Sequence, residues 1–140
     1  IVAYAVMLSA YFLHPFGQNL PLWTILDIIF ALFLIYPTSK LSGYLFKTDV
    51  KRMSMALILT SFVCVATDSL VRVFLLIPCG LHSLFFSGFD EVYLVFVGAA
   101  VNSYIEDLLV VFVSFFAGVP LLLSIKFAIQ KEKQEQKRGV

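Results

Sequence analysis

Charged side chains are scarce in this chain, and their scarcity excludes an ordinary soluble domain. Asp, Glu, Lys and Arg make up 14% of the 140 residues, whereas soluble domains carry roughly 25%. Hydrophobic residues make up 61%, and the mean hydropathy is +0.96. We therefore expect an integral membrane protein, located in the cell membrane with several crossings.

Cysteines and enzyme motifs are also scarce. The two cysteines, Cys64 and Cys79, fall on one expected helix, where ~1.5 Å of rise per residue separates them by ~22 Å, too far for a disulfide. We expect two buried thiols. There is no G-x-S-x-G, H-E-x-x-H or P-loop motif, and no His/Cys pair has metal-ligand spacing. The sequence therefore predicts no catalytic residue, cofactor or metal site.

Long apolar stretches occupy most of the chain. A helix needs about 20 apolar residues to cross ~30 Å of hydrocarbon, and the apolar stretches cover residues 1–13, 20–46, 53–79 and 92–125. The sequence predicts an all-α, polytopic transmembrane bundle with about four spans in residues 1–129. The first stretch is too short to span alone, and the chain begins at Ile1, so we expect an N-terminally incomplete fragment.

The last apolar stretch is too long for one perpendicular crossing. Its 34 residues would extend about 50 Å as a single helix. We expect a break near Asn102 and Ser103, followed by the true crossing over residues 104–125, kinked near Gly118 and Pro120. Residues 130–140 are a charged, low-complexity tail, which we expect to be solvated and disordered.

Basic residues are distributed asymmetrically. Nine of the ten fall in two regions, Lys40, Lys47, Lys51 and Arg52 in one and Lys126, Lys131, Lys133, Lys137 and Arg138 in the other. The segments at 14–19 and 80–91 contain none. By the positive-inside rule, both basic regions and both chain ends are cytoplasmic, and the two segments without basic residues are external. The expected surroundings are the lipid bilayer, with no nucleic-acid partner.

Five ionisable residues lie within the apolar stretches: Asp27, Asp68, Arg72, Glu106 and Asp107. Such residues are costly in hydrocarbon, so they usually face a bundle interior or a wet cavity and mark a ligand or ion path. In the expected topology all five lie toward the outer leaflet. Asp68 and Arg72, at i and i+4, can pair directly, and Arg72 can also reach Glu106 or Asp107 across the bundle.

Two interpretations of this charged group stay open. It can be a structural ion pair that joins two helices, because interhelical polar contacts commonly hold membrane bundles together. It can also form a polar pocket, because four acids around one Arg leave at least two acids without a protein cation, and these call for a ligand, a proton or water. Trp23 at the outer interface and His82 in an external loop are further candidate binding residues for a small-molecule substrate.

The second half of the chain resembles the S components of energy-coupling factor (ECF) transporters. The resemblance is carried by Asp68-Ser-Leu-Val-Arg72 with Pro78 after it, by Tyr104-Ile-Glu106, and by Gly118-Val-Pro120. It implies the last four helices of a six-helix fold. It also implies a vitamin-like or other micronutrient substrate held in the outer half, with Arg72, Asn102 and Glu106 at matching positions. A transmembrane coupling subunit and cytoplasmic ATPases are the implied partners.

Two other functions remain open at this point. In a proton-coupled small-solute transporter, Glu106 or Asp107 would exchange protons, and no ATPase partner would be required. In a non-transporting membrane scaffold subunit, the charges would only join helices. The expectation for function is substrate capture by a non-enzymatic membrane subunit.

Overall fold

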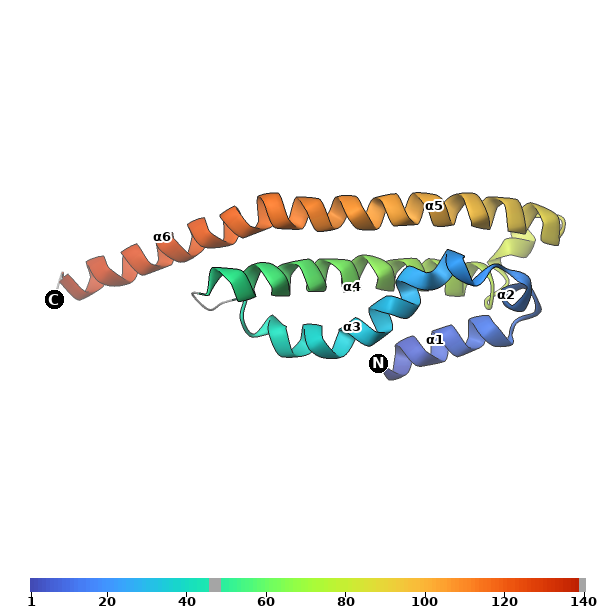
Figure 1. Ribbon diagram of the computed structural model, residues 1–140, viewed down its shortest axis with the longest axis horizontal. Helices are drawn as coiled ribbons and strands as arrows, with labels where there is room; N and C mark the ends of the chain where they lie inside the picture. Colours follow the sequence, from blue (N-terminus) through green and yellow to red (C-terminus); the bar gives the residue numbers. More distant parts are fainter. Residues whose placement is uncertain (46–48, 139–140) are drawn as a thin grey trace.

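The structure, a computed structural model, describes residues 1–45 and 49–138, and over those residues it is helical with no strand. Figure 1 shows the helices running roughly lengthwise, with α6 extending beyond the others. In chain order the elements are α1 (Val2–Leu13), α2 (Pro15–Asn19), the 3₁₀ turn η1 (Leu22–Ile25), α3 (Leu26–Ser42), α4 (Val50–Leu76), the 3₁₀ turn η2 (Leu81–Leu84), α5 (Phe89–Val113), the π-helical segment η3 (Ser114–Gly118) and α6 (Val119–Arg138).

Three of the described helices are long and apolar enough to cross a membrane. They cover Leu22–Ser42, Val50–Leu76 and Phe89–Lys131. The apolar α1 has only 12 residues, about 18 Å at 1.5 Å per residue, and does not reach across ~30 Å of hydrocarbon. The fold is therefore a helical, membrane-embedded type, and the fourth crossing stays a prediction.

The expected break near Asn102 and Ser103 is wrong, because α5 runs through both residues. Neither residue removes a backbone donor, and the surrounding residues are apolar enough to keep the helix intact. The irregularity lies further along, in the π-helical η3 directly before Val119 and Pro120. Proline lacks an N–H and crowds the preceding turn, which accounts for a disturbed ladder at this place.

The charged tail is also different from the expectation. In place of a disordered segment, α6 continues as a helix to Arg138. The residues of this tail, chiefly Lys, Glu and Gln, are strong helix formers, and a helix already established in the membrane extends at little cost.

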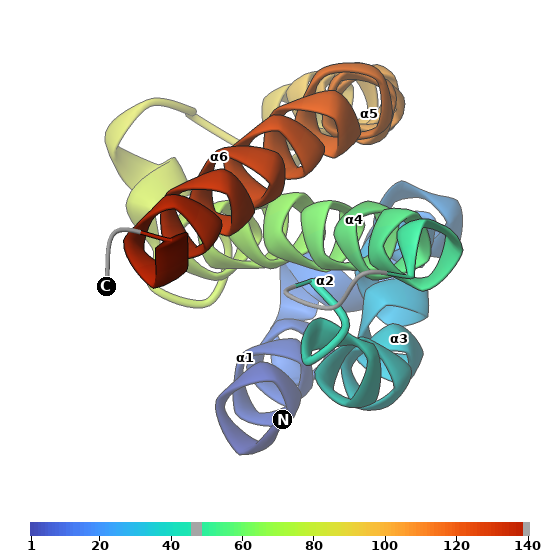
Figure 2. The same ribbon diagram turned by 90° about the vertical axis from the view of Figure 1, so that its left-hand side faces the viewer.

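Helix α4 lies in the middle of the bundle. Figure 2 shows α1 and α3 on one side of it and α5 on the other, and all three helices contact it. The buried core includes side chains from all four helices: Tyr11 of α1, Ile28 of α3, Ala66 and Leu70 of α4, and Phe96 of α5. The two cysteines are outside this core, so the expectation of buried thiols is wrong: Cys64 and Cys79 are both exposed.

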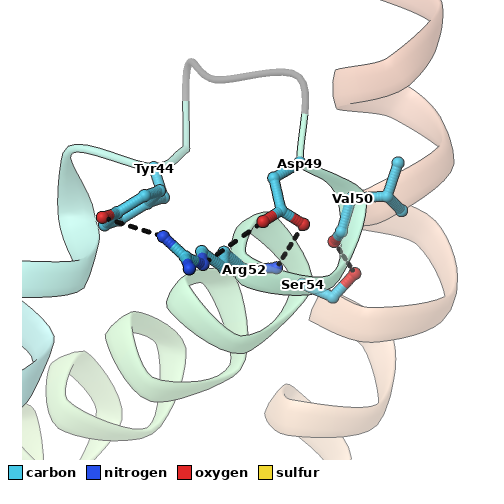
Figure 3. Close-up of polar contacts among 5 residues, drawn as sticks. All are labelled: Tyr44, Asp49, Val50, Arg52 and Ser54. Carbon is cyan, nitrogen blue, oxygen red and sulfur yellow. Dashed lines mark hydrogen bonds and ion pairs between the residues drawn. The ribbon is translucent and has the colours of Figure 1, made fainter.

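Asp49 organises the start of α4. Its carboxylate accepts a hydrogen bond from the Arg52 backbone N–H (3.4 Å) and forms an ion pair with the Arg52 Nε (3.2 Å), as Figure 3 shows. Asp49 is thus the N-cap of α4, satisfying a first-turn donor. Arg52 also donates to the Tyr44 hydroxyl (3.1 Å). This basic end of the bundle also includes the first half of α6, where Lys126 lies 3.1 Å from the Met53 sulfur.

Candidate solute cavity and charged cluster

A cavity of about 140 Å³ lies where the first turns of α3 meet α4 and α5. The lining residues of α4 come from its C-terminal part, and Figure 1 shows this part of α4 toward the end of the bundle that holds α2. The lining residues of the cavity are Thr24, Asp27, Ile28, Ser69, Arg72, Val73, Leu76, Val95, Phe96, Ala99, Ala100 and Ser103. Drug-sized ligands occupy pockets of roughly 300–1,000 Å³, so this cavity suits a small solute or one end of a larger one.

Helical spacing places these residues on common faces. From α4, Ser69, Arg72 and Leu76 follow one another at intervals of three and four, which is the spacing of one helical face. From α5, Phe96, Ala100 and Ser103 do the same. The alanines on the α5 face remove side-chain volume from the seam between the helices, which leaves the space that forms the cavity.

Two serines connect the helices beside the cavity. The Ser69 and Ser103 hydroxyls form a hydrogen bond of 3.1 Å between α4 and α5. Sequence reasoning missed Ser69 as a site residue and assigned Ser103 to a helix break. A serine in an apolar helix is a weak signal, because its hydroxyl can bond its own backbone, as Ser61 does with the Leu57 carbonyl.

Arg72 joins two carboxylates at the edge of the cavity. One guanidinium nitrogen, Nη2, pairs with Asp68 on the same helix, and Nη1 lies 3.5 Å from Glu106 Oε2 on α5. The predicted pairing of Arg72 with Asp68 and its reach to α5 are confirmed. About half of the surface of each of these three side chains is not covered by the rest of the chain. The trio carries one excess negative charge, and its Arg72 also lines the cavity.

Asp27 and Asp107 lie apart from this trio and are buried. Asp27 is 6% exposed in the first turn of α3, and Asp107 is 4% exposed on α5. The two carboxyl groups interact with each other across the helices. Asp27 also lines the cavity, so it belongs both to the cavity and to this acid pair.

The remaining candidate residues lie outside the cavity. Asn102 is exposed on α5, and Trp23 is 41% exposed, with its backbone carbonyl accepting a hydrogen bond from the Tyr104 hydroxyl. His82 belongs to a cluster of rings at the end of the bundle, with Phe16 and His14 at centroid distances of 4.8 Å and 5.8 Å. Its Nδ1 lies 2.9 Å from the Leu76 carbonyl.

No described group of three or more His, Cys, Asp or Glu side chains could hold a metal ion. Comparisons with protein-family models, with curated proteins and with solved structures found no match to this chain.

Proposed function

We propose that this chain is the substrate-binding membrane subunit of an ECF-type importer, with its ligand in the cavity between α3, α4 and α5. The observation that carries the proposal is that three helices contribute both polar and apolar groups to one cavity: Asp27, Ser69, Arg72 and Ser103 beside Phe96 and Val95. Ligand sites in proteins have this composition, mostly apolar walls with a few convergent polar groups.

The direction of capture follows from the charge distribution. The cavity lies toward the end with residues 14–19 and 80–91, which carry no Lys or Arg. By the positive-inside rule that end faces outward. A vitamin-like micronutrient would enter there, its polar groups taking hydrogen bonds from Arg72 and the serines while its apolar part packs on Phe96.

Energy for import would come from partner proteins. The sequence has no P-loop, so the proposal requires a transmembrane coupling subunit and cytoplasmic ATPases. The resemblance of residues 68–120 to S components supports these partners. Transport that proceeds fully in vesicles holding this chain alone would contradict this part of the proposal.

Blocking the cavity tests the binding site directly. Detergent-purified protein is screened by thermal shift against a panel of water-soluble vitamins, and the affinity of any hit is measured by calorimetry. Ala99→Phe, which fills the cavity from α5, is expected to weaken binding at least tenfold, about 1.4 kcal/mol. Arg72→Ala is expected to weaken it for solutes that carry an anionic or carbonyl group.

Leu94→Phe is the matched control, because Leu94 is 72% exposed on the same helix and the added ring lies away from the cavity lining. It should bind as the wild type does. Wild-type affinity in Ala99→Phe would remove the cavity from consideration as the binding site.

A further inference from the structure

The buried acid pair, Asp27 and Asp107, has more hydrogen-bond acceptor atoms than its surroundings satisfy. Asp27 Oδ1 and both Asp107 carboxyl oxygens are buried without a hydrogen-bond partner among the described residues. Buried polar atoms are nearly always paired, and an unpaired one costs about 1–3 kcal/mol. Three such atoms on two facing carboxyl groups point to a ligand that can donate between them.

The neighbouring tyrosines cannot supply that donor, because their protons are used elsewhere. The Tyr4 hydroxyl on α1 donates to the Ile28 carbonyl (2.7 Å), and the Tyr104 hydroxyl donates to the Trp23 carbonyl. Ser103, which also neighbours Asp27, shares a hydrogen bond with Ser69 in which either hydroxyl can be the donor, so it has at most one proton for three unpaired oxygens.

The charged neighbours do not neutralise the pair. Arg72 on α4 borders the same cavity as Asp27 but is shared by Asp68 and Glu106. Glu106, next to Asp107 in sequence, adds a further negative charge nearby. With Tyr4 and Tyr104, these are the titratable and charged groups that face the pair from α1, α4 and α5.

The other side of the pair is an apolar groove that offers little solvation. The groove is lined by Leu26, Phe30, Phe62, Tyr104, Leu108 and Val111 around the two acids. Two ionised carboxylates in contact under these conditions repel each other and have lost much of their hydration, so they cannot both stay charged. Binding one proton removes one charge and supplies the missing hydrogen-bond donor.

We propose that Asp27 and Asp107 form a proton-binding site in which the two carboxyl groups share one proton. The proton is taken up from solvent, one acid becomes neutral, and its O–H donates to a carboxylate oxygen of the other. The pair keeps a single negative charge. Because Asp27 also lines the cavity, the proton can exchange with water there. The site belongs to Asp27 and Asp107, and Glu106 stays in the ion pair with Arg72.

Infrared spectroscopy of the full chain in lipid nanodiscs tests this site without any solute. At mildly acidic pH, where solvated aspartates are ionised, the wild type should show the C=O band of one protonated carboxyl group per chain. The band should shift in D₂O, and it should shift when aspartate carboxyl groups are ¹³C-labelled but not when glutamate is labelled. Raising the pH should remove it in a single step.

Variants then locate the proton. Asp27→Asn and Asp107→Asn should each remove the band, and Asp68→Asn, a change in the exposed trio, should leave it unchanged. Absence of the band in the wild type, a shift with labelled glutamate, or survival of the band in both variants would overturn the proposal. The isotope results hold even if a variant fails to fold, and none of these readouts depends on whether the cavity binds a vitamin.

Discussion

His14 lies between α1 and α2, and its side chain caps the second of these helices. It is the C-cap of α1 and the N-cap of α2, and its Nδ1 accepts a hydrogen bond from the Phe16 backbone N–H (3.2 Å). Pro15 follows at the first position of α2, where a missing N–H is tolerated. The ring therefore has to keep Nδ1 unprotonated for the turn to hold.

Protonation of His14 should loosen this turn. Partial burial, and then the neighbouring His82, lower the pKa of His14 below its ordinary value of 6.5. A histidine with a lowered pKa contributes its full stability above the ordinary value, and the contribution is lost as the pH falls through the folded-state pKa. With two histidines in the chain, NMR of ¹³C-labelled histidine in micelles can resolve His14 and should show it titrating below the free amino acid.

The His82→Gln variant separates the two causes. The variant removes the charge of residue 82 but leaves His14 buried as before. The pKa of His14 should therefore rise part of the way toward 6.5. A His14 pKa at or above the ordinary value in the wild type would contradict the expected packing of the turn.

At the scale of elements, the contact between α4 and α5 includes two polar links of equal sequence separation, Ser69 with Ser103 and Arg72 with Glu106. Exposed ion pairs contribute only about 0–1 kcal/mol in water, whereas a buried charge that loses its partner costs about 3–5 kcal/mol. Because the trio around Arg72 is half exposed, the free energy lost on removing its cation should lie between these two limits.

Replacing the trio distinguishes a binding role from a structural one. Arg72→Leu alone leaves Asp68 and Glu106 without their cation, so we expect it to destabilise the fold, by less than the ~3–5 kcal/mol of a fully buried pair. The triple change Asp68→Leu, Arg72→Leu and Glu106→Leu should restore near wild-type stability, measured by thermal denaturation in detergent, and should still fail to bind the solute. Full function in the folded triple variant would favour the scaffold interpretation.

The helices and one polar contact were predictable from sequence, because both depend on local features. The length of the apolar stretches predicted the long helices, and the i, i+4 spacing predicted the pairing of Asp68 with Arg72. The place where the last long segment becomes irregular was predictable in part, since Pro120 marks it.

The site as a whole was less predictable, because it depends on how each helix is rotated about its axis. These helices are apolar on nearly every face, so the amphipathic pattern that reveals the inner face of a soluble helix is missing. Sequence spacing therefore could not show that Ser69 faces Ser103, or that Asp27 faces Asp107 while Asp68 stays exposed.

For the whole molecule, the position of its charges predicts an orientation in the membrane. The first turn of α4, with Lys51 and Arg52, and the first half of α6, with Lys126, lie at one end of the bundle. The loop after α4, with Cys79, lies at the other. The positive-inside rule then predicts that Cys79 is on the external side.

The two natural cysteines allow this orientation to be measured. Both are exposed on the chain, but Cys64 is in the middle of α4 and Cys79 follows its end. A membrane-impermeant maleimide added to intact cells should therefore label Cys79, and the Cys79→Ala variant should stay unlabelled because lipid covers Cys64. In a Cys79→Ala background, Ser42→Cys, at the exposed end of α3, should be labelled only after the membrane is permeabilised. The opposite pattern, Ser42→Cys labelled from outside and Cys79 protected, would invert the topology and turn the cavity toward the cytoplasm, where it could not capture an external solute.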